Sequence, residues 1–516
     1  MICLECATAF GSILFGPGEP PAAGLTTPAF FTDLNLDQIG AAITRGLDQY
    51  ELMPYFRTPL HDEAVVAYRH EVVRDVRRTE VRETLTTFAG RMQAMRQALT
   101  RAAQLRHPYQ RQRWFLDAAD TYGRAVHTLT EQLQAAELSS EGLRSLRSYL
   151  EAYTGSAGYQ QLTTHVRDLL VRLGQVRYCV HIRGSRVRVT RYEDEADYGA
   201  DVEQTFAKFG QGEVKDYRAP FRSLAEMDQV EGQVLDCVAQ LYPELFQDLT
   251  GFGQAHLNFA DGTIATFDRE VQFYLAYLDY IRPLESAGLP FCYPEVSPDG
   301  HRVRVDDGFD LALASKLAGG RRTVVQNSFQ LDGPERAIVV TGPNQGGKTT
   351  FARMAGQLFY LASLGLPVPG RVAQLFLPDQ IFAHFDMEED LEDFRGRLEH
   401  ELIRMREILQ HASQRSVMVM NESFASTTLE DASFLGAEIL RQLIAKDLVC
   451  VYVTFIDQLA SLSPACVSMV AGVDPSHPAD RTFRVVRKPA DGLAYAAAIA
   501  GRHGLSYQRL KERIAR

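Results

Sequence analysis

One segment near residue 340 constrains the fold more than any other part of the chain. Residues 337–341 form an apolar run of strand length, and residues 351–364 form a segment of helix length. Between them the sequence matches the phosphate-binding pattern G-x-x-x-x-G-K-[ST], in the order Gly342, Pro343, Asn344, Gln345, Gly346, Gly347, Lys348, Thr349 and Thr350. The alternative is a glycine-rich turn without chemistry, but the strand-loop-helix context favours a phosphate loop.

The same pattern gives the polar groups of this loop their expected roles. Glycines let backbone N–H groups turn inward around phosphates, at the positive end of the helix that follows. We expect Lys348 to reach the terminal phosphates and the Thr349 hydroxyl to ligate Mg²⁺. Asn344 lies beside the phosphates and would help to bind the nucleotide. All residues from 342 to 350 are therefore predicted to bind nucleotide, with ATP and Mg²⁺ as cofactors.

A second motif follows about seventy residues later, where an apolar strand over residues 417–420 ends in Asn421 and Glu422. In a phosphate-loop fold this position normally supplies a carboxylate to the hydration shell of the metal, and then a Glu that polarises the attacking water. The Asn421 amide oxygen can accept a hydrogen bond from a magnesium-bound water but adds no negative charge. We expect Glu422 to be the general base; the alternative is an ordinary carboxylate at a strand end.

Length and composition set limits on the rest of the chain. The 516 residues are too many for one ordinary domain, and 46% hydrophobic with 23% charged residues is a globular balance. The sequence contains no run of eighteen apolar residues, so no membrane-spanning helix is predicted. The N-terminus is a poor secretion signal. The seven cysteines fit a reducing cytoplasm. A net charge of −11 argues against a general nucleic-acid coat but permits a local basic stripe.

The pattern along the chain predicts a multidomain protein. Residues 1–35, rich in Gly, Pro and Thr, are predicted to be an extended N-terminal arm. Residues 36–290 carry helical periodicity, interrupted by a β-containing insertion at residues 176–218. Residues 291–516 alternate short β-rich runs with helix-length segments, which predicts an α/β domain with a parallel sheet.

Arginine is concentrated around a predicted β-hairpin in the insertion. Period-two alternation flanks a Gly184-Ser185 turn, and the basic residues are Arg177, Arg183, Arg186, Arg188 and Arg191. Arg186 and Arg188 would project from one face, as contacts to DNA phosphates require, and Arg183 joins them as a predicted DNA-binding residue. The alternative is a solvated strand face.

Two further clusters are weaker. Cys3 and Cys6 form a single C-x-x-C pair, which cannot complete a tetrahedral zinc site, so an inert arm is expected. The carboxylates of residues 386–390 are expected to form a solvated loop rather than a metal site.

Several motifs together resemble one family, the MutS mismatch-repair ATPases. The segment Thr341 to Thr350 is similar to the family's TGPNMGGKST, and Leu364-Gly365-Leu366-Pro367-Val368-Pro369 is similar to its turn after the first helix. Ile408-Leu409-Gln410-His411-Ala412 followed by Met420-Asn421-Glu422 is similar to ILHNA and MDE in order and spacing. Phe31 to Gln38, and Pro59-Leu60 before Ala67-Tyr68-Arg69, resemble further segments of the family. The resemblance covers residues 30 to 516.

The resemblance implies a fold and an assembly. It implies an all-helical core and lever domain with a clamp-like insertion, followed by an ABC-like ATPase domain of the MutS type. It also implies a homodimer formed through the ATPase domains, in which each subunit completes the nucleotide site of the other.

The sequence also departs from the family. Only about thirty residues precede the helical core and no aromatic-x-Glu motif is evident, so mismatch reading of the known kind is not expected. No nuclease-like domain is expected at the C-terminus. The family's trans-acting Ser-Thr-Phe segment corresponds to Gly396-Arg397-Leu398, with the following Glu kept as Glu401, and Arg395 or Arg397 could replace the serine electrostatically. Ser423 begins a segment that replaces a Gly-rich loop. Phe455 stands at the sensor histidine, which, with Asn421, predicts slow or regulated hydrolysis.

Two hypotheses from different functional classes are consistent with these residues. The leading hypothesis is a dimeric, cytoplasmic ATPase that binds duplex, mismatched or branched DNA as a nucleotide-gated clamp in DNA repair or recombination, away from membranes. Its catalytic residues would be Glu422 and Lys348, and Thr349 with Asn421 (through water) would hold the metal. The alternative is a nucleotide-gated protein-interaction scaffold that has lost DNA binding and hydrolyses ATP slowly or not at all.

Overall fold

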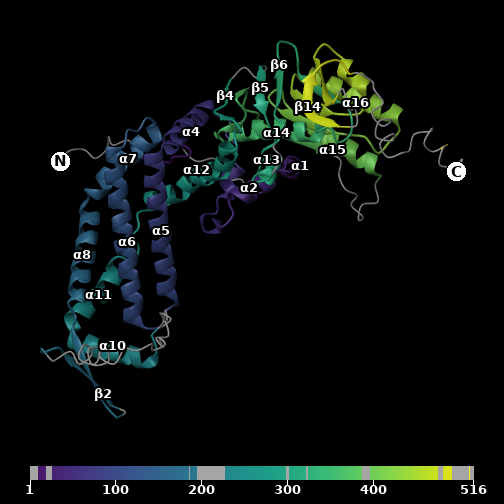
Figure 1. Cartoon of the computed structure of the whole chain (residues 1–516). Helices are drawn as coiled ribbons and strands as arrows, with labels where there is room; N and C mark the ends of the chain where they lie inside the picture. Colours follow the sequence, from purple (N-terminus) through teal and green to yellow (C-terminus); the bar gives the residue numbers. More distant parts are fainter. Residues whose placement is uncertain are drawn as a thin grey trace, which may run out of the picture. The chain divides into compact units, whose positions relative to one another are not determined.

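The fold consists of two compact units (Figure 1). The computed structural model describes residues 10–18, 26–184, 186–194, 227–297, 302–320, 324–385, 396–474, 480–490 and 511. The helical unit is formed within Thr79–Leu138 and Arg144–Asp268, and the sheet unit within Phe10–Arg78, Ser139–Leu143 and Arg269–Arg516. Among the described residues, no helix is both long enough and apolar enough to cross a membrane.

The helical unit is built on two long helices, α5 (Thr79–Gln104) and α6 (Pro108–Ala135), which lie side by side (Figure 1). Val81, Leu85, Phe88 and Met92 of α5 are buried at three- and four-residue spacing, which is the stripe that a packed helix requires. The shorter elements of the unit are α7 (Glu141–Thr154), α8 (Ala157–Gly174), α10 (Gln229–Leu241), α11 (Pro243–Ala255) and the start of α12 (Gly262–Ser286). The helical periodicity of residues 36–290 is thus confirmed by the long helices of this unit.

Local caps define where several of these helices begin. Ser156 accepts a hydrogen bond from the Tyr159 N–H at the start of α8, and Asp228 forms a capping box with Glu231 at the start of α10. The predicted hairpin is also present, as β1 (Tyr178–Arg183) paired with β2 (Arg186–Arg191) in antiparallel register.

The sheet unit contains the predicted parallel sheet. Its six strands lie in the order β10-β11-β12-β7-β13-β14. All neighbours pair in parallel except β14, which is antiparallel to β13. The strands are β7 (Ala337–Thr341), β10 (Ile381–Phe385), β11 (Val417–Asn421), β12 (Val449–Val453), β13 (Cys466–Val473) and β14 (Arg481–Arg487). Because β7, β11 and β12 are buried along their whole length, their sequences read as continuous apolar runs.

Helices cover both faces of this sheet. On one face α15 (Arg397–His411) and α16 (Leu429–Ala445) share a core with Met418 and Met420 of β11 and Cys450 and Tyr452 of β12. The helix α14 (Lys348–Ser363) also contacts β11 and β12 and is buried along almost its whole length. The helix after the phosphate loop therefore lies in the interior of the unit, where its position is fixed.

Smaller elements complete the sheet unit. A second sheet has the order β4-β9-β5-β6, and β3 pairs with β8. These strands are β3 (Phe291–Cys292), β4 (Glu295–Val296), β5 (Val303–Gly308), β6 (Asn327–Leu331), β8 (Val368–Pro369) and β9 (Val372–Leu375). The remaining helices are α1 (Phe30–Asp33), α2 (Leu36–Ile43), η2 (Asp48–Tyr50), α3 (Met53–Phe56), α4 (Glu63–Val76), α13 (Leu311–Leu317) and η3 (Asp457–Ser461).

The N-terminal segment differs from the expected extended arm. Ile13 and Leu14 are fully buried, and the Glu270 carboxylate accepts hydrogen bonds from the Ser12 hydroxyl and the Ile13 N–H. Leu34 is buried against Gly356 of α14. The expectation of an extended arm is wrong for residues 10–15 and 30–34. The prediction followed the Gly and Pro content of the segment, but its apolar residues are buried in the core of the sheet unit.

The remaining expectations concern the domain boundary and several features outside the described residues. The boundary expected at residue 290 followed sequence character, whereas compactness groups Phe10–Arg78 with the phosphate loop. The pair Cys3 and Cys6, the acidic cluster at 386–390, Arg395 and most of the insertion beyond residue 194 lie outside the described residues.

Candidate nucleotide site

The phosphate loop, residues 342–349, joins β7 to α14 in a conformation that requires glycine at two positions. Gly342 has a φ of +115° and Gly347 a φ of +92°, values that L-residues with side chains rarely adopt. A Cβ at Gly342 would also lie 2.9 Å from the Ala471 carbonyl oxygen. Gly347 is the N-cap of α14 and has no side chain to cap it, so the first N–H groups of the helix are directed into the loop.

Lys348 folds back over this loop. Its ammonium donates hydrogen bonds to the carbonyl oxygen of Gly342 at 2.9 Å, to that of Pro343 at 3.3 Å and to Asn344 Oδ1 at 3.2 Å. The side chain is only 4% exposed, and burial lowers the pKa of Lys348, while the nearby Glu422 carboxylate opposes the shift. A buried cation is thus held by oxygen acceptors of the phosphate loop itself.

The two predicted metal residues meet although they are far apart in the sequence. The Thr349 hydroxyl donates a hydrogen bond of 2.9 Å to Asn421 Oδ1. Asn421 is the last residue of β11, which contacts α14, so fold rather than sequence spacing brings the two side chains together. A hydroxyl and an amide oxygen at this edge are oxygen ligands of the kind that Mg²⁺ prefers, directly or through water.

Glu422 lies in a strained turn beside the lysine. Its Oε1 is 3.8 Å from Lys348 Nζ, and its side chain is 37% exposed. Its φ is +51°, and that of Phe424 is +65°, a conformation that costs a non-glycine residue on the order of 1–3 kcal/mol. We call residues 421–424 the β11 turn. The strain persists because the surrounding structure holds the turn, and strain of this kind is typical of functional sites.

Sequence patterns did not single out two residues of β14 that lie at the loop. Arg481 Nε donates to the Asn344 carbonyl oxygen at 3.2 Å. Phe483 has a φ of +58° and is 49% exposed, and a Cβ on Gly347 would lie 3.6 Å from it. Asn327 fixes this segment, because its amide donates to the Phe483 carbonyl oxygen and accepts from the Val485 N–H. No local signal marks these residues, since only the pairing of β14 with β13 brings them to the loop.

Phe455, expected at the position of a sensor histidine, follows β12 and is 45% exposed. A phenyl ring offers no hydrogen-bond donor, so this position adds none to the site. Gly396 is the N-cap of α15, and Glu401, one turn into that helix, accepts from the Phe424 N–H at 2.6 Å.

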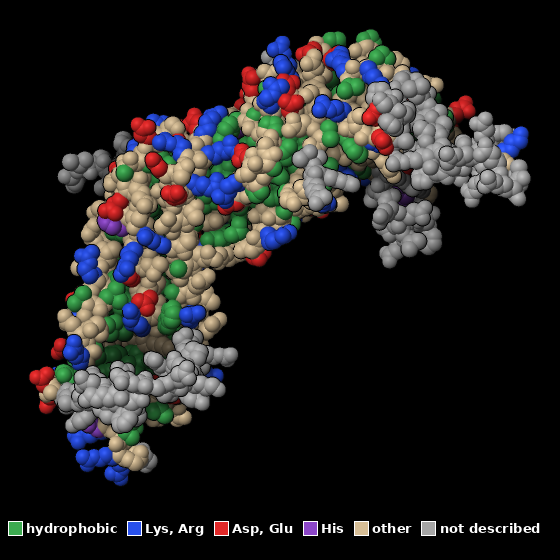
Figure 2. Space-filling model, viewed as in Figure 1, with side chains coloured by type: hydrophobic (Ala, Val, Ile, Leu, Met, Phe, Trp, Pro, Cys, Tyr) green, Lys and Arg blue, Asp and Glu red, His purple; other side chains and the backbone are tan. Residues whose placement is uncertain are grey.

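The three arginines predicted to bind DNA share one face of the hairpin in the helical unit. Arg183 pairs directly with Arg186, and Arg188 with His181, so all four side chains project to the same side. Arg191 belongs to the other face, where it donates to the Leu241 carbonyl oxygen and lies over the Tyr242 ring. Figure 2 shows Lys and Arg side chains gathered at the β1–β2 end of the helical unit. Arg191 therefore attaches the hairpin to the end of α10, while the three arginines predicted to bind DNA are solvent-exposed.

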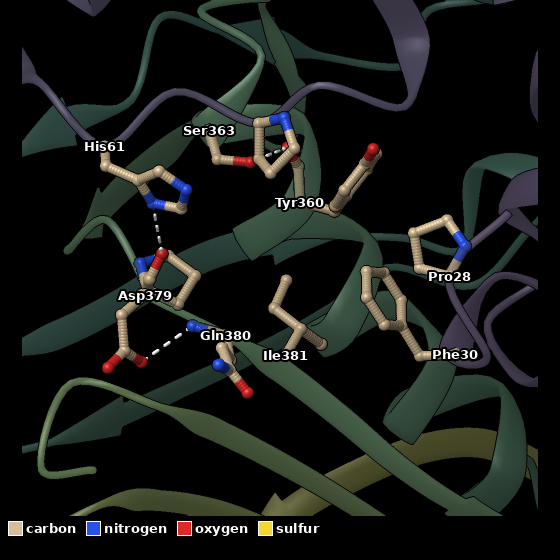
Figure 3. A pocket seen from close by; sticks show the side chains of 10 residues that line it. Pro28, Phe30, His61, Tyr360, Ser363, Asp379, Gln380 and Ile381 are labelled. Carbon is tan, nitrogen blue, oxygen red and sulfur yellow. Dashed lines mark hydrogen bonds between the residues drawn. The ribbon is translucent and has the colours of Figure 1, made fainter. Parts of the chain in front are cut away.

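The sheet unit also contains a hollow of about 260 Å³, which Figure 3 shows, and none of its lining residues belongs to the phosphate loop. Tyr360 and Ser363, which line it, lie in the last turn of α14, about 20 Å from the first turn at the usual helical rise. His61 Nδ1 lies 3.2 Å from the Pro378 carbonyl oxygen, and Asp379 accepts from the Gln380 N–H at 2.6 Å. These polar groups stabilise the connection between β9 and β10.

Comparisons with known proteins agree with this geometry. Residues 338–486 match the family model described as MutS domain V. The chain is 26% identical over 255 residues to the "DNA mismatch repair protein MutS" of Syntrophomonas wolfei, covering 48% of this chain and 29% of that protein. It is 30% identical over 192 residues to the "Endonuclease MutS2" of Thermus thermophilus, covering 36% of this chain and 25% of that protein. A "DNA mismatch repair protein MutS" of Desulfovibrio desulfuricans is 29% identical over 164 residues, 31% of this chain and 17% of that protein.

The matches thus span less than a third of the length of these relatives. The matched domain contains the whole phosphate loop from Gly342 and the β11 turn, which are the parts of the site described above. The domain at residues 338–486 thus matches the MutS family, and over this part the chain is similar to MutS and MutS2 proteins.

Proposed function

We propose that the chain is an ATP-dependent DNA-binding protein of the MutS type, which works as a dimer and uses its nucleotide state to gate a clamp on DNA. The observation that carries the proposal is the convergence of Lys348, Thr349, Asn421 and Glu422 at one edge of the parallel sheet. In open α/β sheets, ligands bind at the carboxyl ends of the strands, which is the edge where these residues lie.

The residues of the loop suit a nucleoside triphosphate with Mg²⁺. The backbone N–H groups of residues 344–350 would bind phosphate oxygens, and Lys348 would exchange its contacts with loop carbonyl oxygens for contacts with the terminal phosphates. Thr349 and Asn421 would hold the metal, directly and through water. Bound Mg²⁺ supplies neutralisation of phosphate charge. Phe483, exposed beside Gly347, offers an aromatic surface for the base.

Hydrolysis in this proposal depends on Glu422 and is slow. Glu422 would take the proton of the attacking water, since it is the carboxylate beside Lys348. Asn421 lacks the negative charge that an Asp would contribute, and Phe455 adds no hydrogen-bond donor. Both features weaken turnover more than binding, so the nucleotide would act mainly as a switch.

DNA contact is assigned to the exposed hairpin face with Arg183, Arg186 and Arg188. Their guanidinium groups suit phosphate oxygens, and the contact would be independent of sequence. The second candidate, a protein-interaction scaffold that has lost DNA binding, is favoured by the net charge of −11.

Binding to homoduplex, mismatched and branched DNA at low salt, with and without ATP and Mg²⁺, tests the proposal. We expect ATP to change the affinity of the wild type but not that of the Lys348→Ala variant. The double variant Arg186→Ala/Arg188→Ala should bind DNA more weakly, whereas the matched variant Arg167→Ala, which changes an exposed arginine of α8, should not. Absence of binding to all three DNAs would favour the scaffold. Sedimentation with and without ATP tests the dimer.

A further inference from the structure

The β11 turn must be held by the rest of the protein, because its own backbone disfavours the conformation in which it presents Glu422. Glu422 and Phe424 both have positive φ values, and neither is a glycine. The Phe424 ring is fully buried, which fixes one end of the turn. The Glu422 N–H donates to the Val453 carbonyl oxygen at 2.9 Å, which fixes the other end against β12.

The contact that closes the turn comes from α15. Glu401 Oε2 accepts from the Phe424 N–H at 2.6 Å, and Glu401 Oε1 lies 3.3 Å from the Ser426 hydroxyl. A carboxylate that accepts a backbone N–H forms a charge-assisted hydrogen bond, which is stronger than a neutral one. One side chain therefore holds the backbone two residues beyond Glu422 and the segment that follows.

The helix that carries Glu401 is itself anchored one turn later. Arg404, three residues on and thus on a neighbouring position of the same helical face, donates to the Ala383 carbonyl oxygen at 2.8 Å and to Asp33 Oδ2 at 3.0 Å. Ala383 belongs to β10, the strand next to β11. Arg404 therefore fixes α15 against the sheet. Because Glu401 lies on the same helix, its contact with the Phe424 N–H fixes the turn relative to α15.

We infer that Glu401 is a positioning residue that holds Glu422 in the orientation needed to activate water. This inference rests on the proposed hydrolysis of ATP. The contacts of Glu401 with the Phe424 N–H and the Ser426 hydroxyl lie on the turn and the segment after it, so its removal should affect turnover and leave nucleotide binding intact. His384 makes a separate contact with the turn, through Nδ1 at 2.8 Å from the Ser423 hydroxyl, but it does not bond the Phe424 N–H.

The test compares Glu401→Ala and Glu401→Gln with Glu407→Ala, a matched control. Glu407 lies on the same helix with an exposed side chain. Three quantities are measured on the full chain: affinity for a fluorescent ATP analogue, kcat and KM for ATP, and amide hydrogen exchange of residues 421–426. Glu401→Ala should lower kcat by about ten- to a hundredfold, as when a reacting group is displaced by roughly 1 Å, and should accelerate exchange in the turn.

Glu401→Gln keeps an oxygen acceptor and should restore most of the kcat and the slow exchange, while Glu407→Ala should match the wild type. The inference is overturned if Glu401→Ala keeps wild-type kcat or wild-type exchange. It is also overturned if the Gln and Ala variants lose kcat, affinity and melting temperature equally, since that would mark a purely structural role. Failure of the wild type to bind or hydrolyse ATP would instead refute the proposed function, and with it any role for Glu401 in turnover.

Discussion

The phosphate loop and the β11 turn lie side by side but are stabilised in different ways. In the loop most contacts are local: Lys348 bonds to Gly342, Pro343 and Asn344, and the Gly346 N–H bonds to the Pro343 carbonyl oxygen. The β11 turn is held by residues distant in sequence. His384 comes from β10, Val453 from β12 and Glu401 from α15.

This difference indicates that binding and turnover can vary separately in this protein. A loop that is stabilised by its own residues retains its ability to bind phosphate as long as those residues are unchanged. A turn that depends on distant elements is sensitive to changes in any of them. The departures from the family pattern agree with this division. Asn421 lies in the turn, and Phe455 follows β12, the strand that bonds the turn, whereas the loop from Gly342 to Thr349 keeps the phosphate-loop pattern.

The largest expected effect concerns the turn and falls on turnover alone. Glu422→Gln removes the general base but keeps the size of the side chain, so kcat should fall by about 10²- to 10⁴-fold. Affinity for ATP should stay within about threefold, because the loop is unchanged and a factor of three is under 1 kcal/mol. Single-turnover hydrolysis and equilibrium binding check both values. Normal turnover in this variant would exclude Glu422 as the base.

The converse effect concerns the loop. Lys348→Ala removes the buried cation of the site, and nucleotide affinity should fall by about ten- to a hundredfold, the value of one hydrogen bond to a charged group. Calorimetric titration with ATP and Mg²⁺ measures the loss, and an unchanged thermal melting curve shows that the fold is intact. If affinity is retained, the loop does not bind phosphate as assigned.

A smaller effect, an increase in kcat, is expected when a carboxylate is restored at residue 421. Asn421→Asp restores a negative charge next to Thr349, where it would strengthen the interaction with Mg²⁺. We expect kcat to rise by about tenfold, a gain of about 1.4 kcal/mol in transition-state stabilisation. The dependence of kcat on Mg²⁺ concentration should shift to lower concentrations in parallel. A kcat that stays the same or falls would mean that Asn421 does not limit turnover.

The smallest effect is a pH dependence that belongs to the turn. Burial, aided by the charge of Arg404, lowers the pKa of His384 to about 4, so the folded state keeps this side chain neutral. The unfolded chain takes up a proton near pH 6.5, so the contribution of His384 is complete above that pH and is lost as the pH falls from about 6.5 towards 4. From pH 8 to 6 the loss should be about 0.8 kcal/mol.

The variant His384→Asn isolates this term, since other groups titrate equally in both proteins. The stability of the wild type relative to the variant, measured by urea unfolding, should decrease by that amount between pH 8 and 6. A difference that does not change with pH would contradict a neutral, buried His384.

The sequence predicted the phosphate loop better than the β11 turn, because the loop is stabilised by neighbouring residues and the turn by distant ones. The loop is encoded by contiguous residues after a strand, so β7 was placed at its observed bounds, and Lys348 and Thr349 were identified from the pattern. Asn421 and Glu422 were identified from the strand end and do lie beside them. The positive φ of Glu422, the Glu401 contact and the approach of Arg481 depend on pairing between distant elements, which no local pattern records.

The N-terminal segment illustrates the same limit. Its Gly and Pro content predicted an exposed arm, but Ile13 and Leu14 are buried and Glu270 bonds the backbone there from far along the chain. Composition describes local preference, while burial depends on what the rest of the chain supplies. In the hairpin, by contrast, the period-two pattern was sufficient to place Arg186 and Arg188 on one face, and the observed strand pairing adds Arg183 to that face.

A crystal structure with a non-hydrolysable ATP analogue and Mg²⁺ tests the central claim most directly. We expect the triphosphate to bind within residues 342–349, with Lys348 Nζ moved from the Gly342 carbonyl oxygen to phosphate oxygens and the metal bound by Thr349. We also expect the β11 turn to keep its backbone and the bond from Phe424 to Glu401. An analogue bound elsewhere, or a loop in which Lys348 keeps its carbonyl contacts at saturating analogue, would contradict the claim.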